Sequence, residues 1–134
     1  MEIGELVNKQ SYDFVDLCEI MNILRGENGC PWDREQTHKS IRKNLIEETY
    51  EVVEAIDGDD TRLLCEELGD LMLQVVFHSK MAEEKNRFNI NDVCDGICKK
   101  LIVRHPHIFS DVSANTSDEV LKNWEEIKKK TKSD

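Results

Sequence analysis

The chain has 134 residues, of which 39% are apolar, and its 18 Lys and Arg face 28 Asp and Glu, a formal net charge of −10. This length and composition are typical of one folded domain and exclude a disordered chain, while the acidity disfavours binding to nucleic acid or to anionic membranes. The five cysteines are odd in number and lack Cys-x-x-Cys spacing, which excludes a disulfide framework and a zinc ribbon.

The first six residues contain two glutamates and lack the apolar core of a signal peptide. No stretch reaches the ~18 apolar residues of a membrane span. We therefore expect a cytoplasmic protein with no membrane partner.

Helical periodicity dominates the chain and predicts an all-α bundle of about five helices. The first helix carries an apolar face from Phe14 to Leu24 and ends in a loop with two glycines and Pro31. The second spans about residues 38–57, with Ile41, Leu45, Val52 and Ile56 on one stripe. The third spans about 61–84, and its middle, residues 71–77, is apolar nearly all round, which indicates burial in a core or against a partner subunit.

The fourth helix is expected over about residues 91–105, where Pro106 disfavours its continuation. The last covers about 116–130 and begins with Thr116 and Glu119 in the spacing of a capping box. No linker divides the chain, so we predict a single domain over residues 1–134.

Acidic residues on the second and third predicted helices form the pattern Glu-Glu-x-x-Glu, fifteen residues, Glu-x-x-Asp. In a chain this acidic the spacing alone is weak evidence. The position of two acids is more informative: Glu48 interrupts the apolar stripe between Leu45 and Val52, and Asp70 directly precedes the apolar run. The pattern comprises Glu47, Glu48, Glu51, Glu67 and Asp70.

Burying several like charges is unfavourable unless a cation neutralises them, and the basic residues on these two helices are too few. Carboxylate ligands without His or Cys favour a hard ion, so we predict a site for Mg²⁺, with Mn²⁺ as a possible substitute. The alternative is that these acids are surface residues near helix ends. A second alternative, a metal site at Cys94 and Cys98 with His105 or His107, lacks the usual ligand spacing.

Basic and aromatic residues on the last two predicted helices complement the acidic site. Lys100 and Arg104 continue the stripe of Val93 and Ile97, and on the last helix Trp124 is followed one turn later by Lys128. Cations and an aromatic ring suit the phosphates and base of a nucleotide. Equally, the basic side chains can be solvated helix ends and Trp124 a core residue.

Several segments between Leu17 and Lys128 together resemble the MazG family of nucleoside triphosphate pyrophosphohydrolases. They are Gly29-Cys30-Pro31-Trp32-Asp33, Glu47-Glu48-Thr49-Tyr50-Glu51, Glu66-Glu67-Leu68-Gly69-Asp70-Leu71, Arg87-Phe88, Arg104-His105-Pro106-His107 and Asn123-Trp124-Glu125. The resemblance implies an all-α bundle that works as a homodimer. One departure is Val103, where related sequences often carry a second basic residue.

The resemblance also implies roles for the site residues. Glu48, Glu51, Glu67 and Asp70 occupy the family's Mg²⁺ ligand positions, and Lys100, Arg104, Trp124 and Lys128 match positions that contact the nucleotide. Glu47 matches the first acid of the Glu-Glu-x-x-Glu signature, and its role is open. It is a residue that supports a metal ligand, a ligand to another ion, or the residue that orients the attacking water.

The implied reaction converts a nucleoside triphosphate and water into a nucleoside monophosphate and pyrophosphate. An alternative of another class is a non-catalytic helical module that dimerises through residues 71–77 and senses nucleotides. A relative restricted to dUTP or dCTP would share the carboxylates but not the Cys-Pro-Trp and Arg-His-Pro-His segments.

Overall fold

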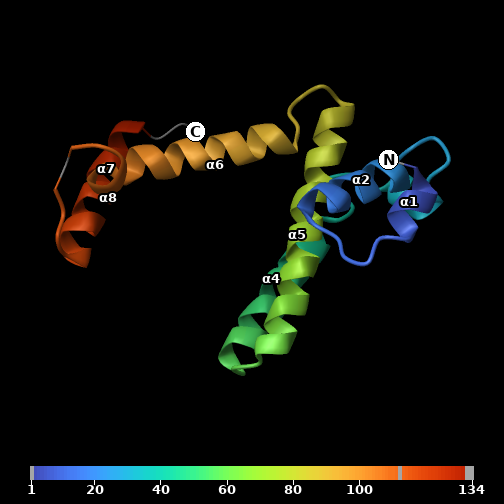
Figure 1. The fold of residues 1–134 in the computed structure, drawn as a ribbon, viewed down its shortest axis with the longest axis horizontal. Coiled ribbons are helices and arrows are strands. Elements are labelled where there is room, and N and C mark those ends of the chain that lie inside the picture. The colour runs from blue at the N-terminus through green and yellow to red at the C-terminus, as the bar shows by residue number, and fades with distance from the viewer. Residues whose placement is uncertain (1, 112, 132–134) are drawn as a thin grey trace. The chain divides into compact units, whose positions relative to one another are not determined.

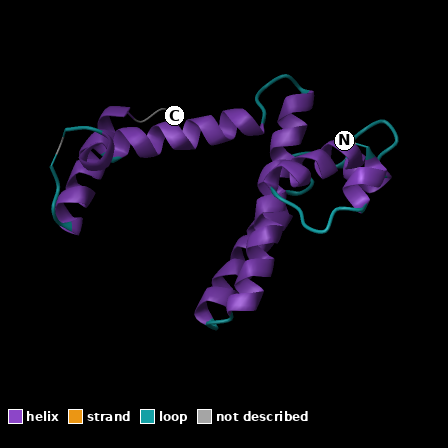
Figure 2. Ribbon diagram, in the orientation of Figure 1, coloured by secondary structure: helices purple, strands orange, loops and turns teal. Residues whose placement is uncertain are grey.

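The computed structural model describes residues 2–111 and 113–131, in which every regular element is a helix (Figures 1 and 2). The all-α prediction is thereby confirmed. The chain divides into two compact units, Met1–Ile90 and Asn91–Asp134, and a single domain over residues 1–134 stays a prediction. Within the described residues, no helix has both the length and the apolar character needed to cross a membrane.

The helices follow the predicted order, with three short additions. The first unit holds α1 (Ile3–Val7), α2 (Phe14–Leu24), α3 (Pro31–Glu35), α4 (Arg42–Asp57) and α5 (Thr61–Glu84), and the second holds α6 (Ile90–Arg104), α7 (Pro106–Phe109) and α8 (Ser117–Thr131). The additions α1, α3 and α7 have five residues or fewer, too few for an apolar period to repeat. The prediction of about five helices therefore counted only the long ones.

The second predicted helix begins four residues later than expected. Thr37 and Ser40 cap each other reciprocally: the Thr37 amide donates to Ser40 Oγ at 2.8 Å and the Ser40 amide donates to Thr37 Oγ1 at 3.1 Å. These bonds hold a turn ahead of the helix, because short hydroxyl side chains can accept hydrogen bonds from nearby backbone amides. Helix α4 accordingly starts at Arg42.

Helices α4 and α5 pack side by side as a hairpin (Figure 1). Gly58 caps the end of α4, and Asp59 adopts a left-handed conformation with φ of 54° that Asp tolerates better than most residues. Asp60 then caps α5, its Oδ1 accepting from the Leu63 amide at 3.0 Å. This short reversal brings the acidic segments of the two helices opposite each other.

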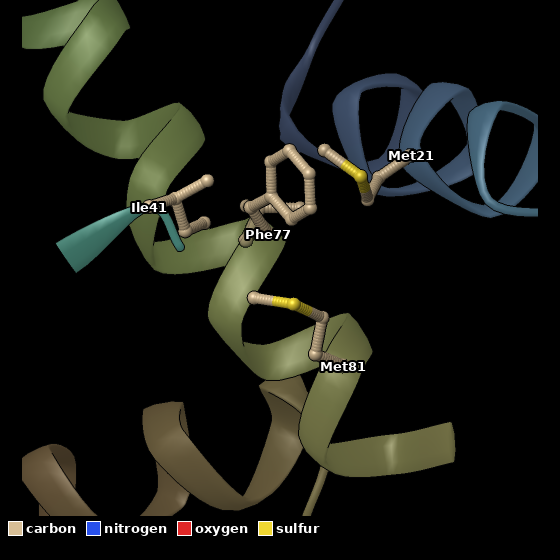
Figure 3. Close-up of a cluster of buried hydrophobic side chains, with 5 residues drawn as sticks. Met21, Ile41, Phe77 and Met81 are labelled. Atoms are coloured by element: carbon tan, nitrogen blue, oxygen red, sulfur yellow. The ribbon is translucent and has the colours of Figure 1, made fainter. Parts of the chain in front are cut away.

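The core of the first unit lies where α2 meets the second half of α5 (Figure 3). Met21 from α2 and Ile41, just before α4, pack with Val76, Phe77 and Met81 from α5, and all five are at most 4% exposed. Each such side chain contributes about 1.5–3 kcal/mol when fully buried. The core thus anchors α5 on the C-terminal side of its acidic segment.

Two polar contacts fasten the segment between α2 and α4 to α5. Arg25 forms a bidentate ion pair with Glu84, at 2.7 and 2.8 Å, and also donates to the carbonyls of Asp33 and Gln36. The Nδ1 atoms of His38 and His78 lie 2.7 Å apart. Together these contacts hold the segment between α2 and α4 against α5.

The two histidine rings lie edge to edge. Their planes differ by 4°, and their centroids are 5.0 Å apart, which exceeds the nitrogen–nitrogen distance by about two ring radii. They therefore share an in-plane N–H···N bond, for which one nitrogen must keep its lone pair. Burial lowers the pKa of His78, and the neighbouring His38 lowers it further.

Some predicted core positions are exposed in this chain. On α4, Ile56 is 56% exposed, and Ala55 takes the buried position at 1%. On α5, Val76 and Phe77 are buried as predicted, whereas Met72 and Val75 are 45% and 42% exposed. The apolar run is therefore covered on one side only.

In the second unit, none of the residues of α6 is buried, and the stripe of Val93 and Ile97 is itself 37% and 52% exposed. The N-terminus of α8 follows the predicted capping box in part. The Glu119 amide donates to Thr116 Oγ1 at 3.2 Å, but the Glu119 carboxylate accepts from the Asn115 amide instead of the Thr116 amide.

Candidate functional site

Four of the five predicted acids converge across the α4/α5 hairpin. Glu48 and Glu51 lie one turn apart on α4, and Glu67 and Asp70 lie one turn apart on α5. Each offers a carboxylate oxygen, and these four oxygens all lie within 4.8 Å of one another. This is the separation expected of ligands that share one ion.

The burial of the four acids differs from the sequence-based expectation. Glu48 and Glu67 are half-buried, whereas Glu51 and Asp70 are exposed. Asp70, whose place directly before the apolar run predicted burial, is exposed because that run is itself open on one side. The convergence of the four carboxylate oxygens, more than their burial, supports a metal site here.

Two oxygen atoms of the cluster fit the chemistry of a bound cation. Glu48 Oε2 and Glu67 Oε2 are both buried without a hydrogen-bond partner. A buried anionic oxygen without a partner is costly, and a hard divalent ion is the kind of ligand that satisfies several such atoms at once. The donor set, all carboxylate, matches Mg²⁺ or Mn²⁺ better than Zn²⁺.

The same crowding of like charges shifts proton affinities. A hydrogen bond with Glu51, burial and the neighbouring charges raise the pKa of Glu67 to about 7. Burial, followed by the charges of Glu51 and Asp70, raises the pKa of Glu48 as well. Without a cation, Glu67 therefore retains its proton up to about neutral pH.

Cation binding should therefore compete with that proton. Glu67 binds its proton more tightly in the folded chain than in the unfolded one, so its contribution to stability is lost as pH rises through about 7. We expect Mg²⁺ to raise the melting temperature more at about pH 8 than at about pH 6. Thermal unfolding with and without Mg²⁺ measures this difference. Glu67→Gln should remove most of the pH dependence of this Mg²⁺ effect. An equal rise in the wild-type melting temperature at both pH values would contradict the competition between cation and proton.

Glu47 stands apart from the four converging acids. Its side chain is 57% exposed and lies 4.0 Å from the Lys43 ammonium, one turn earlier on α4. An exposed ion pair at that distance is weak and leaves the carboxylate free to turn. The role of Glu47 stays a prediction.

In the second unit, Trp124 on α8 is the centre of a small cluster. The Arg104 guanidinium lies 5.4 Å from the centre of the indole ring, a cation–π contact, and the His105 ring meets the indole edge-on at 4.9 Å. His105 is itself held by its Nδ1, 2.7 Å from the Leu101 carbonyl. Arg104 Nε is buried and has no hydrogen-bond partner. A donor without an acceptor at this position suits an anionic ligand.

The other two predicted nucleotide contacts, Lys100 and Lys128, are exposed. Sequence reasoning missed the contact of His105 with Trp124 and a pocket of about 430 Å³ beside Trp124. The pocket is lined by Ala114, Asn115, Thr116, Ser117, Val120, Leu121, Trp124 and Glu125. The N-terminal turn of α8 could have indicated this pocket, but its residues were interpreted only as a helix cap.

The alternative metal site is not supported. Cys94 and Cys98 are free and exposed, and in the described part of the chain the carboxylate cluster is the one group of three or more His, Cys, Asp or Glu side chains with converging ligand atoms.

The fold and the cluster define an all-α chain with a carboxylate site suited to a divalent cation. The MazG nucleotide pyrophosphohydrolase domain matches residues 36–109. The chain therefore belongs to the MazG family, which confirms the resemblance drawn from its motifs.

Relatives agree with this assignment. The nucleoside triphosphate pyrophosphohydrolase of Escherichia coli K12 is 55% identical over 113 residues, 84% of this chain and 43% of the relative. The nucleoside triphosphate pyrophosphohydrolase/pyrophosphatase MazG of Thermotoga maritima is 48% identical over 119 residues, 89% and 45% of the two chains. This chain thus spans less than half the length of each.

A solved structure supports the fold. The crystal structure of a mazG-related protein from Thermotoga maritima matches with a TM-score of 0.69 and 27% identity, covering 84% of this chain and 96% of the other.

Proposed function

We propose that the chain hydrolyses nucleoside triphosphates to nucleoside monophosphates and pyrophosphate with Mg²⁺ held by Glu48, Glu51, Glu67 and Asp70. The observation that carries the proposal is the convergence of these four carboxylates within 4.8 Å. Mn²⁺ is the expected substitute, because it accepts the same oxygen ligands.

The bound cation would polarise the phosphoryl oxygens and lower the pKa of a coordinated water. The carboxylates hold that cation and, through it, give this acidic chain a place for a triphosphate. Glu47, exposed and adjacent in sequence to Glu48 on α4, orients the water that attacks the α-phosphorus. The bond from that phosphorus to the bridging oxygen breaks, and pyrophosphate leaves.

The residues that match nucleotide-contact positions by family resemblance all lie in the second unit. Arg104, with its unpaired Nε, donates to the phosphate oxygens, and Lys100 and Lys128 add positive charge. The base is bound in the pocket beside Trp124, whose indole provides an apolar face.

Product identification tests the proposal. The chain is incubated with each NTP and dNTP and Mg²⁺, and the products are separated by chromatography. We expect monophosphate and pyrophosphate in equal amounts. Diphosphate with inorganic phosphate would mean cleavage at another bond, and saturable binding without any product would identify a nucleotide-sensing module instead.

We further propose that the chain works as a homodimer, as the family resemblance implies. Each helix of the hairpin carries an exposed apolar stripe at helical spacing: Ile46, Tyr50 and Val53 on α4 and Leu68, Met72 and Val75 on α5, each 42–66% exposed. A patch of this kind is unusual on a monomer, and a second copy of the same surface covers it without any other partner.

Light scattering coupled to size exclusion measures this association. Met72→Lys and Val53→Lys place a charge in the two stripes and should convert a dimer into a monomer. Glu66→Lys, an exposed change on α5 outside the stripes, is the control and should remain dimeric. A wild-type chain that is monomeric at micromolar concentration would refute the dimer.

A further inference from the structure

Gln74 is a buried polar residue that the carboxylate site does not account for. Its side chain lies on α5 with 7% of the residue exposed, and its Oε1 has no hydrogen-bond partner in the described chain. An unsatisfied buried amide of this kind costs about 1–3 kcal/mol, which an apolar residue of similar size would avoid.

The helix register directs Gln74 toward the acidic cluster. It follows Asp70 by four residues and Glu67 by seven, so the three lie on one face of α5. Side chains on a helix lean toward its N-terminus, and Gln74 therefore leans over the turn that carries Asp70.

The unsatisfied atoms closest to the acidic residues along this face share one chemistry, whereas the unsatisfied Nε2 of His78 lies one turn beyond Gln74. Glu48 Oε2, Glu67 Oε2 and Gln74 Oε1 are all oxygen acceptors, each buried without a donor. The carboxylate oxygens suit a cation directly. An amide oxygen one turn farther along suits a water molecule on that cation, because Mg²⁺ keeps several of its waters and each of them needs an acceptor.

We propose that Gln74 is a positioning residue of the metal centre, and that its Oε1 accepts a hydrogen bond from a water molecule coordinated by the cation that the four carboxylates hold. The inference rests on the metal site of the proposed function. A neutral acceptor orients the water without adding a fifth negative charge to a crowded cluster.

A purely structural role for Gln74 fits less well. Ser79, the next buried polar residue on α5, is satisfied within the helix, since its hydroxyl donates to the Val75 carbonyl at 2.8 Å. The helix thus buries one polar side chain whose hydroxyl has a partner and another whose amide oxygen has none. The unpaired oxygen belongs to the residue that lies on the face of the carboxylates.

Binding of Mn²⁺ in the absence of nucleotide tests the inference. Electron paramagnetic resonance measures the ion that remains free. Gln74→Leu keeps the volume and removes the acceptor, so we expect Mn²⁺ affinity to fall about tenfold, the usual effect of losing a partner of a ligand. The melting temperature of the metal-free protein should stay the same or rise, because an unpaired polar group is removed. Ser79→Ala is the matched control and should leave Mn²⁺ affinity unchanged.

Two further variants separate chemistry from packing. Gln74→Asn withdraws the amide by one methylene and should also weaken Mn²⁺ binding, whereas Gln74→Glu keeps an oxygen at the same reach and should retain it. Equal affinity in the wild type, Gln74→Leu and Gln74→Asn would overturn this inference alone. A wild-type chain that binds no Mn²⁺ would overturn the carboxylate site and this inference together.

Discussion

Glu48→Gln or Asp70→Asn is expected to abolish pyrophosphate release while helical content stays nearly intact. Each change removes a charged oxygen from a group of four that converge within 4.8 Å. Loss of a residue that hydrogen-bonds to a metal ligand lowers metal affinity or activity about 10–100-fold. Loss of a ligand itself should therefore lower activity by more than about 100-fold. The metal-free protein should not lose stability, because one of several crowded acidic groups is gone.

The measurement is pyrophosphate release at saturating Mg²⁺, with circular dichroism to verify the fold. Glu54→Gln is the matched control, an exposed glutamate on the same helix that lies outside the cluster. It should keep wild-type activity. Full activity in Glu48→Gln or Asp70→Asn would show that the proposed site is wrong.

Arg104→Gln is expected to lower kcat/KM by about 10²–10³-fold, the usual cost of removing a preorganised donor to developing charge. The guanidinium is held by the Trp124 ring at 5.4 Å, and its Nε is buried without an acceptor. A donor fixed in this way costs little reorganisation when a phosphate oxygen arrives. Arg104→Lys should rescue little, since an ammonium lacks the planar stacking surface of the guanidinium.

Steady-state kinetics with one nucleotide test this expectation. Lys99→Gln on the same helix is the control, because Lys99 is occupied by an exposed ion pair with Asp95 at 2.8 Å. It should change kcat/KM by no more than a few-fold. If both variants behaved alike, Arg104 would act only through the net charge of α6.

The residues that form the carboxylate cluster could be predicted from the sequence, but their burial could not. The spacing of Glu48 with Glu51 and of Glu67 with Asp70 places each pair on one helical face, which local geometry alone ensures. Their burial was not predictable, because the exposure of Asp70 depends on what covers the neighbouring apolar run. Gln74 was overlooked because a lone glutamine in an apolar run has no periodic signal.

The long helices followed from the sequence because apolar period, capping residues and breakers are local properties, and α5 begins and ends at the residues predicted. The family followed too, since its motifs are continuous segments. The three-dimensional fold was needed to show which atoms remain without partners, how the His38 and His78 rings meet, and that Arg104 lies over Trp124. These are contacts between residues 20 to 40 positions apart, and no local pattern encodes such distances.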